Sequence, residues 1–478
     1  MYYSCRFFFI IFFLVLLGSC SQKHYTDALS PEEALKKFQL NGDFEIQLYA
    51  AEPFVRDPVS MVFDEQGNIY VVEMPDYPFA AEPGKEQGKI KVLKDTNNDG
   101  RVDQAIVFAE GLSEATTLLP WKGGLLVTAA PQILYLKDTT GDYKADIKQT
   151  LFKGFFKGNS EAQVTALRYA IDNWIYAANM GYESHVTEEN NPDTNSLSLV
   201  GTDFRFRLDK NLYEPAAGTA QFGQAIDDWG HRFITENSSH IKQVVVPWKY
   251  VHRNRNASSY KDVTNISDHG EDIFQLTPPP YWRAERTKRR NEQYQAEHLD
   301  RVEYADKHFS GAAGGTFYTG DKFPADFYGN YFTVDVAAGL VHRDVLSRTD
   351  TSTIYKASLM GYEKNHEFLA STDPWFRPVN VCVGPDGYLY VVDMYRQHIE
   401  TPFSIDEDLK AEMNFMNGSE LGRIYRIVPK KTNAANNTPN TKNFTAKDWV
   451  ALLQHPNQAW RLHAQRRLVE MQDTSVGA

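Results

Sequence analysis

One seven-residue pattern recurs six times along the 478-residue chain and limits the possible folds more than any other feature. Its last copy reads YLYVVDM, an apolar run with one polar residue in sixth place. The first residues of successive copies lie 56, 50, 57, 99 and 58 positions apart. A strand pattern repeated about every 50 residues is typical of a β-propeller with one blade per copy. The sequence therefore predicts an all-β fold, a six-bladed propeller. The copies are Asn68–Met74, Gly124–Ala130, Trp174–Met180, His231–Asn237, Asn330–Val336 and Tyr388–Met394.

The last blade is predicted to be completed by the N-terminal end of the propeller. Its third strand is Arg423–Ile427, and the Asn-, Thr- and Pro-rich segment that follows favours a linker instead of a fourth strand. Phe44–Tyr49 alternates like a strand, and pairing it with Arg423–Ile427 would leave no open edge. The expected organisation is a tether with a short helix (21–42), the propeller (43–429, with an insertion at about 254–310), a linker (430–443) and the start of a HEAT-like helical repeat (444–478).

Residues 1–20 are predicted to be a targeting segment. Arg6 precedes the apolar run Phe7–Leu17, and Leu17-Gly18-Ser19-Cys20 resembles a bacterial lipobox, in which the cysteine is lipidated. The alternative is a plain signal peptide or a short anchor. The lipobox interpretation places the mature chain in the bacterial cell envelope, as a lipoprotein that faces the periplasm or the cell surface.

Charge and cysteine content narrow the range of partners. The formal net charge is −12 and the isoelectric point is about 5.6, which argues against a nucleic-acid partner. The chain has three cysteines and no CxxCH haem attachment motif, so neither a disulfide framework nor a haem of its own is expected. Cys382 lies within a predicted strand and is interpreted as a buried structural thiol.

An aspartate-rich loop in the first blade is a candidate calcium site. Asp95, Asn97, Asp99 and Asp103 place oxygen ligands at intervals around a glycine turn, as calcium loops do. The related loop 138–146 in the second blade keeps fewer of these residues. The alternative is a tight turn closed by aspartate side chains without a metal.

The sixth position of the repeated pattern is polar in five of its six copies. Because strand ends crowd together near the axis of a propeller, we expect these side chains to form a ring at one mouth of the central channel. The alternative is that they cap turns at the ends of their strands. The six residues are Glu73, Ala129, Asn179, Glu236, Asp335 and Asp393.

The predicted strand order brings further loops to the same mouth. Connections that follow second strands lie on the same side as connections that precede first strands, so aromatic, arginine and carboxylate side chains should meet there and form a small-molecule site. For Trp375 and Arg377, packing between two blades is the alternative. The predicted site comprises Glu73, Asp76, Tyr77, Asp335, Trp375, Arg377, Asp393, Tyr395 and Arg396.

Several stretches of the sequence resemble the PVC-type membrane-bound dehydrogenase family. The matching segments include YAAEPFVRDP (49–58), DTNNDGRVD (95–103), QFGQAIDDWGHRF (221–233), ASTDPWFRPVN (370–380) and GPDGYLYVVDMYR (384–396). The resemblance covers about residues 40–430. The propeller of that family is similar to soluble quinoprotein glucose/sorbosone dehydrogenases, and its longer members continue into HEAT repeats and a cytochrome c.

The resemblance implies a dehydrogenase outside the cytoplasm that oxidises a sugar or an alcohol. Electrons would pass to a quinone (PQQ-like) or to a haem partner such as a cytochrome c. Relatives carry a catalytic histidine just before the first strand of blade three, where this chain has Ala162, so another base is needed. The alternative function is a non-catalytic lipoprotein whose propeller binds a carbohydrate or a protein. Candidate bases are Asp393, Glu73 and His342, and candidate holders of an anionic cofactor or oxyanion are Arg377, Arg396 and Arg168.

Overall fold

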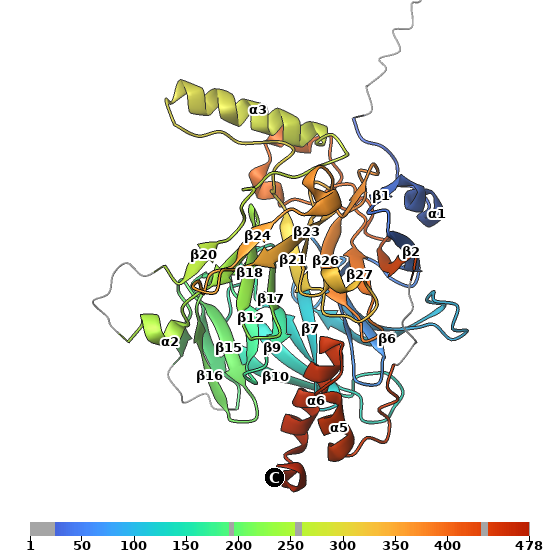
Figure 1. Ribbon diagram of the computed structural model, residues 1–478. Coiled ribbons are helices and arrows are strands. Elements are labelled where there is room, and N and C mark those ends of the chain that lie inside the picture. The colour runs from blue at the N-terminus through green and yellow to red at the C-terminus, as the bar shows by residue number, and fades with distance from the viewer. Residues whose placement is uncertain (1–23, 191–195, 254–260, 432–437, 478) are drawn as a thin grey trace, which may run out of the picture.

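The structure is a computed structural model that describes residues 24–190, 196–253, 261–431 and 438–477. Its strands form six sheets, and the predicted six-bladed β-propeller is confirmed (Figure 1). Cys20 and the rest of the predicted targeting segment lie outside the described residues.

The first three blades follow one another along the chain. Each is an antiparallel sheet that begins at the propeller axis and runs outward. Blade one contains β3 (Pro58–Phe63), β4 (Ile69–Glu73), β5 (Gly88–Lys94) and β6 (Gln104–Leu112). Blade two contains β7 (Ala115–Trp121), β8 (Gly124–Ala129), β9 (Gln132–Lys137) and β10 (Ile147–Lys153), extended by β13 (His185–Glu188) and β14 (Leu197–Ser198). Blade three contains β11 (Thr165–Tyr169), β12 (Ile175–Ala178), β15 (Asp203–Arg207) and β16 (Leu212–Ala216).

Blade four also uses consecutive strands, whereas blades five and six each include one strand from the N-terminal end. Blade four contains β17 (Gly223–Ile226), β18 (Arg232–Glu236), β19 (Ser239–Val244) and β20 (Val263–Asn265). Blade five contains β21 (Ala312–Phe317), β22 (Tyr331–Asp335), β23 (Leu340–Ser347), β24 (Lys356–Ser358), β25 (Leu369–Ser371) and β1 (Phe38–Leu40). Blade six contains β26 (Pro378–Val383), β27 (Leu389–Asp393), β28 (Arg423–Pro429) and β2 (Phe44–Ala51).

The ring closes by the predicted pairing. β2 runs antiparallel to β28, with Ile46 opposite Ile427, so the N-terminal strand completes blade six. A second N-terminal strand was not predicted: β1 pairs with β25 at the edge of blade five, with Gln39 opposite Ala370. The N-terminal segment therefore spans two adjacent blades and covers two sheet edges.

Helices lie at both ends of the propeller (Figure 1). At one end, α3 (Tyr281–Ala296) rises from the long insertion between β20 and β21, and its Trp282 packs against Ile405, Leu409 and Phe415. At the other end lie α5 (Ala446–Leu452) and α6 (Gln458–Met471). The shorter helices are α1 (Pro31–Ala34), α2 (Trp248–Val251) and α4 (Glu407–Lys410), with 3-10 turns at Leu35–Lys37, Ala325–Phe327, Gly361–Lys364, Pro402–Ser404 and Thr474–Val476.

Helix α6 is fastened to the propeller by buried polar contacts. The Trp460 indole donates to the carbonyl oxygen of Pro385 (2.8 Å), and Arg466 Nη2 lies 2.8 Å from Glu65 Oε2. These contacts join the helical segment to blades six and one. No helix within the described ranges is both long enough and apolar enough to cross a membrane.

Candidate functional site

The first strands of the six blades surround a central channel that contains two cavities. The axial cavity lies at the end of the channel that carries the insertion, and α3 contributes Arg283 to its wall. A second, helix-side cavity lies at the opposite end and is bounded by α6. Arg168 of β11 lines both cavities, so its guanidinium lies between them.

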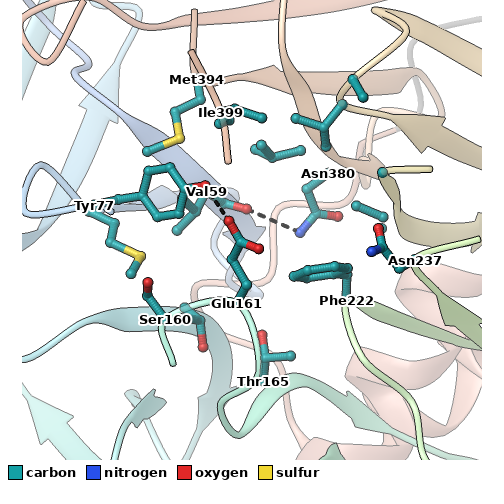
Figure 2. A pocket seen from close by; sticks show the side chains of 18 of the residues that line it. Val59, Tyr77, Ser160, Glu161, Thr165, Phe222, Asn237, Asn380, Met394 and Ile399 are labelled. Atoms are coloured by element: carbon teal, nitrogen blue, oxygen red, sulfur yellow. Dashed lines mark hydrogen bonds between the residues drawn. The ribbon is translucent and has the colours of Figure 1, made fainter. Parts of the chain in front are cut away.

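Glu161 is the acid at the centre of the axial cavity (Figure 2). It lies in the loop before β11, where the backbone N–H of Glu161 donates to Asn159 Oδ1 (2.9 Å). The Tyr77 hydroxyl donates to Glu161 Oε1 (2.5 Å), which orients the carboxyl group. Burial, followed by the nearby charge of Glu400, raises the pKa of Glu161 to about 7. A carboxylate with such a pKa can accept a proton near neutral pH.

Two arginines face the same cavity without a carboxylate partner among the described residues. Within the described residues, the Arg168 side chain donates one hydrogen bond, from Nη1 to the carbonyl oxygen of Leu167 (3.1 Å). Arg283 is 7% exposed, and its Nε has no hydrogen-bond partner within the described chain. Unpaired guanidinium groups in a partly enclosed cavity are suited to an anionic ligand group.

Apart from Glu400, neutral polar and apolar side chains form the rest of the wall. Asn380 donates to the carbonyl oxygen of Val59 (3.5 Å), and Asn237 lies on the same side of the cavity as Asn380 (Figure 2). Phe222 and Met394 supply apolar surface. A mostly apolar wall with a few converging polar groups is typical of a site for a small polar molecule.

The ring predicted from the sixth position of the repeated pattern is not found at the channel. Asp393 is fully buried, and its Oδ1 accepts hydrogen bonds from the backbone N–H groups of Arg377 and Tyr395. Asp335 accepts from the N–H groups of Ser310, Gly311 and Ala338. Both carboxylates thus cap the ends of their strands, which is the alternative interpretation, and neither lines the axial cavity.

The same correction applies to Glu73, Asn179 and Glu236. Glu73 pairs with Lys91 (2.8 Å), Asn179 donates to the carbonyl oxygen of Tyr182 (3.2 Å), and Glu236 pairs with Lys242. Ala129 is buried in apolar surroundings. Because adjacent side chains in a strand point to opposite sides, the seventh position, one residue later, faces the axis in four copies. Those residues are Met74, Asn237, Val336 and Met394.

Arg377 has the contacts of a packing residue. Its Nε donates to the carbonyl oxygen of Arg396, Nη2 to that of Gln397, and Nη1 to those of Val336 and Ala337, at 3.1–3.3 Å. All these acceptors are backbone oxygens in blades five and six or the loop after β27. Arg377 therefore joins two blades and uses four of its five N–H donors on backbone oxygens, in line with the alternative interpretation.

Trp375, Tyr395 and Arg396 are also buried away from the axial cavity. The Trp375 indole donates to the carbonyl oxygen of Thr26 (2.9 Å), and the Tyr395 hydroxyl accepts from the N–H of Leu29 (3.0 Å). These two side chains hold the N-terminal segment. Arg396 forms a two-pronged ion pair with Asp57, at 2.5 and 2.8 Å, that joins blade six to blade one.

Asp76 and His342 occupy positions with no access to the axial cavity. Asp76 Oδ2 accepts a hydrogen bond from the N–H of Gln87 (2.8 Å). His342 is 1% exposed on β23, beside Glu367 and Asp344. Burial disfavours the charged imidazole, but these two carboxylates outweigh it and raise the pKa of His342 to about 10. Its position outside the axial cavity excludes His342 as the predicted base.

The aspartate-rich loop of blade one is closed by its own hydrogen bonds. Asp95 accepts from the N–H groups of Asp99 and Gly100, and Asp103 accepts from Thr96. Asn97 Oδ1 accepts from the N–H of Asp99 (2.9 Å). This pattern accounts for the loop as a set of aspartate turns, and calcium binding stays a prediction.

Three charged residues of the cavity were missed by the sequence analysis. Glu161 lies directly before Ala162, the position at which a base was sought, and is the carboxylate nearest to it in the sequence. Arg283 belongs to a charge-rich helix that carries no pattern pointing to a site. Glu400 follows the repeated pattern by six residues and has no motif of its own. Of the predicted site residues, Tyr77 and Arg168 line the cavity.

The fold and the cavity define a propeller with a charged site on its axis, and comparison with known proteins gives its family. Residues 30–431 match the family described as Domain of unknown function (DUF7133), so the chain belongs to that family. No curated protein matches the sequence.

Solved propellers resemble the chain only distantly. The PQQ-bound form of aldose sugar dehydrogenase from Streptomyces coelicolor has 12% identity and a TM-score of 0.42, over 82% of this chain and 99% of that one. The PQQ domain of pyranose dehydrogenase from Coprinopsis cinerea has 10% identity and a TM-score of 0.42, over 82% and 97%. Similarity at this level carries no argument about the reaction, and the resemblance to the PVC-type family stays a prediction.

Proposed function

We propose that this protein is a dehydrogenase-like propeller that oxidises a hydroxyl group of a sugar or an alcohol, with Glu161 as general base. The position of Glu161 carries the proposal: it lies one residue before Ala162, inside the axial cavity, with a pKa raised to about 7. Oxidation of an alcohol to a carbonyl removes the proton from the hydroxyl oxygen and a hydride from the carbon that bears this hydroxyl group. Glu161 accepts the proton, and Tyr77 keeps its carboxylate in place.

A second group must accept the hydride, and the cavity fits an anionic one. Arg168 reaches the cavity from strand β11, and Arg283 reaches it from helix α3 of the insertion. Neither arginine has a carboxylate partner among the described residues. Guanidinium groups bind carboxylates through paired hydrogen bonds. A carboxylated quinone, when bound, would accept the hydride, and the two arginines would hold its carboxylates. Electrons would then leave to a cytochrome c, since residues 1–478 contain no CxxCH motif of their own.

The test is reconstitution of the purified full chain with pyrroloquinoline quinone. We expect saturable binding of the quinone and, with a panel of sugars and primary alcohols, reduction of an electron-accepting dye that requires both quinone and substrate. Arg283→Gln should weaken quinone binding by about tenfold or more, the size of one charged hydrogen bond. A matched control is Arg289→Gln, which replaces an arginine on the solvent side of the same helix, paired with Asp408.

Two outcomes would count against the proposal. Absence of quinone binding at micromolar concentration would overturn the cofactor assignment. Saturable binding of a sugar without dye reduction under any condition would favour the alternative, a propeller that binds carbohydrate without catalysis, because the same polar cavity suits both.

We also propose that Cys20 carries a lipid anchor in the bacterial cell envelope. The support is the sequence alone: an apolar run followed by Leu17-Gly18-Ser19-Cys20. Cys20→Ser should move the protein from the membrane fraction to the soluble envelope fraction, with Cys382→Ser as the control. Unchanged partition of the Cys20 variant would contradict the lipobox interpretation.

Calcium binding by Asp95, Asn97, Asp99 and Asp103 is kept as a separate proposal, supported by the spacing of their oxygen ligands. Removal of calcium with a chelator should lower the melting temperature, and Asp99→Ala should abolish that effect. Asp142→Ala, in the related loop of blade two, is the matched control. Equal melting temperatures with and without the chelator would leave the loop as a set of turns.

A further inference from the structure

Four metal-binding side chains from distant parts of the sequence meet between blades four and five. His240 lies on β19, His342 and Asp344 lie on β23, and His269 lies in the loop that follows β20. One potential ligand atom from each lies within 4.8 Å of all the others. The cluster is separate from the axial cavity, since none of the four residues lines it.

We propose that His240, His269, His342 and Asp344 bind a divalent transition-metal ion, with zinc as the best match to the ligand set. Three imidazole nitrogens and one carboxylate oxygen are ligands that zinc accepts in four-coordinate sites. Four protein ligands leave no open position, so the site would be structural and not catalytic.

The three imidazole rings converge on one carboxylate. Their centroids lie 5.0–5.2 Å apart in all three pairs. His240 Nε2 lies 2.8 Å from Asp344 Oδ2, His269 Nε2 lies 3.0 Å from Oδ1, and His342 Nε2 lies 3.7 Å from Oδ2. Each ring thus directs its Nε2 atom toward the same point, as ligands of a shared ion do.

A second carboxylate fixes the orientation of one ligand. Glu367 Oε2 lies 2.8 Å from Nδ1 of His342, and Glu367 Oε1 accepts from the backbone N–H of Phe274 (2.7 Å). A carboxylate behind a metal-binding histidine holds its Nδ1 proton and leaves the Nε2 lone pair for the ion. In agreement with this role, His342 Nε2 is buried and has no hydrogen-bond partner within the described chain.

Burial makes the cluster costly without a ligand at its centre. Asp344 is 0% exposed, and His240 and His342 are each 1% exposed. His240 stacks on Phe309 at 4.3 Å, which excludes water on that side. Buried polar atoms are normally hydrogen-bonded, and an ion would take the place of the proton on His342 Nε2, which has no hydrogen-bond partner within the described chain. The side chain of His269 is 12% exposed, so an ion can enter from its side.

The ion would hold the base of the insertion against the propeller. His269 and Phe274 belong to the segment that leads from β20 to α3, whereas the other ligands and Glu367 belong to blades four and five. The same α3 places Arg283 in the axial cavity. Metal binding would therefore fix the segment that leads into α3, and with it the position of Arg283 in the cavity wall.

The experiment uses the full chain, stripped with a chelator and then titrated with zinc alone. We expect about one equivalent of tightly bound zinc per chain and a higher melting temperature with the ion than without it. Cobalt(II) in place of zinc should give the visible absorption bands of a four-coordinate site, a measurement that needs no variant.

Variants separate a metal site from a hydrogen-bonded cluster. His269→Ala, at the most exposed ligand, should lower zinc affinity by at least ~100-fold, and Glu367→Gln should lower it by roughly 10- to 100-fold. His308→Ala is the matched control: it removes a histidine of the same insertion that lies 3.7 Å from Asp272, outside the cluster. It should bind zinc as the unchanged protein does.

The proposal is overturned if the folded protein binds neither zinc nor cobalt at micromolar concentration, or if His269→Ala binds zinc as tightly as the unchanged protein. Both readouts are independent of enzymatic activity, so failure here leaves the proposed dehydrogenase function standing.

Discussion

The two ends of the central channel are built from the same innermost strands but present different side chains to their cavities. On β7 the axial cavity is lined by Thr116 and Thr117, whereas the helix-side cavity is lined by Leu118 and Leu119, one or two residues further along. On β26 the change is from Asn380 to Val383. The axial cavity lies beneath the insertion, and the helix-side cavity lies against α6.

The contrast indicates that the charged residues at one end of the channel stabilise the fold, whereas those at the other end are available to bind a ligand. At the helix-side end the arginine that α6 contributes is paired: Arg466 binds Glu65 at 2.8 Å and Glu470 at 3.0 Å. At the axial cavity Arg168 and Arg283 have no carboxylate partner within the described ranges. Paired charges stabilise the fold, and unpaired charges in a cavity are available to a ligand.

Replacement of Glu161 should have the largest effect on activity. Glu161→Gln keeps the shape and removes the proton acceptor, so turnover should fall by about 10²- to 10⁴-fold, the usual contribution of a general base. The melting temperature should stay the same or rise, because a buried charge is removed. Steady-state kinetics and thermal melting of one preparation measure both. Turnover within tenfold of the unchanged protein would exclude Glu161 as the base.

The equivalent change at the other end should affect stability instead. Glu65→Gln removes one of the two carboxylates that pair with the buried Arg466, which should cost about 2 kcal/mol of unfolding free energy. Quinone affinity per folded molecule should be unchanged. Urea denaturation followed by quinone titration of the folded fraction is the measurement. If Glu65→Gln lowered quinone affinity without lowering the unfolding free energy, the two ends of the channel would not have the separate roles assigned to them.

The two glutamates should also respond to pH with opposite signs. The pKa of Glu161 is raised to about 7, so below pH 7 its ionised fraction, and with it turnover, should fall by about tenfold per pH unit. Its contribution to stability is present below about pH 4.5 and is lost as pH rises through 7.

Burial opposes ionisation of Glu65, but Arg466 outweighs it and lowers its pKa to about 2. Its contribution to stability is therefore present above about pH 4.5 and is lost as pH falls toward 2. Urea denaturation across this range should show the acid-side loss in the unchanged protein and a smaller loss in Glu65→Gln. A flat pH–rate profile between pH 5 and 8 would contradict the assignment of Glu161.

Repetition made the architecture predictable from the sequence. Six copies of one strand pattern give the blade count, and a last blade that lacks a strand requires Phe44–Tyr49 to complete it. Both inferences depend on periodicity and on the need to cover sheet edges, which are local properties.

The site was less predictable because it depends on which side chain faces the axis. A shift of one residue separates the buried cap Asp393 from the cavity residue Met394, and the pattern does not say which of the two points inward. Glu161 lies in a loop and Arg283 in an insertion, where no repeat constrains the path of the chain. In the histidine cluster, His269 lies 29 positions after His240 and 73 before His342, and no motif spacing links the three.

The smallest expected effect distinguishes two arginines that look alike in the sequence. Arg377 donates to four backbone carbonyl oxygens, whereas Arg283 has no such set of acceptors. Lysine keeps the charge but loses the planar fork. Arg377→Lys should therefore leave some of these oxygens without a donor and cost about 1–2 kcal/mol of unfolding free energy, with quinone affinity per folded molecule intact.

Arg283→Lys is the matched comparison and should do the reverse, weakening quinone binding with little change in melting. Both effects can be measured by urea denaturation and by quinone titration of the folded fraction. If Arg377→Lys lowered affinity and left stability unchanged, Arg377 would return to the site as a ligand contact. Arg377 and Arg283 would then not differ in role, despite the difference in their hydrogen-bond partners.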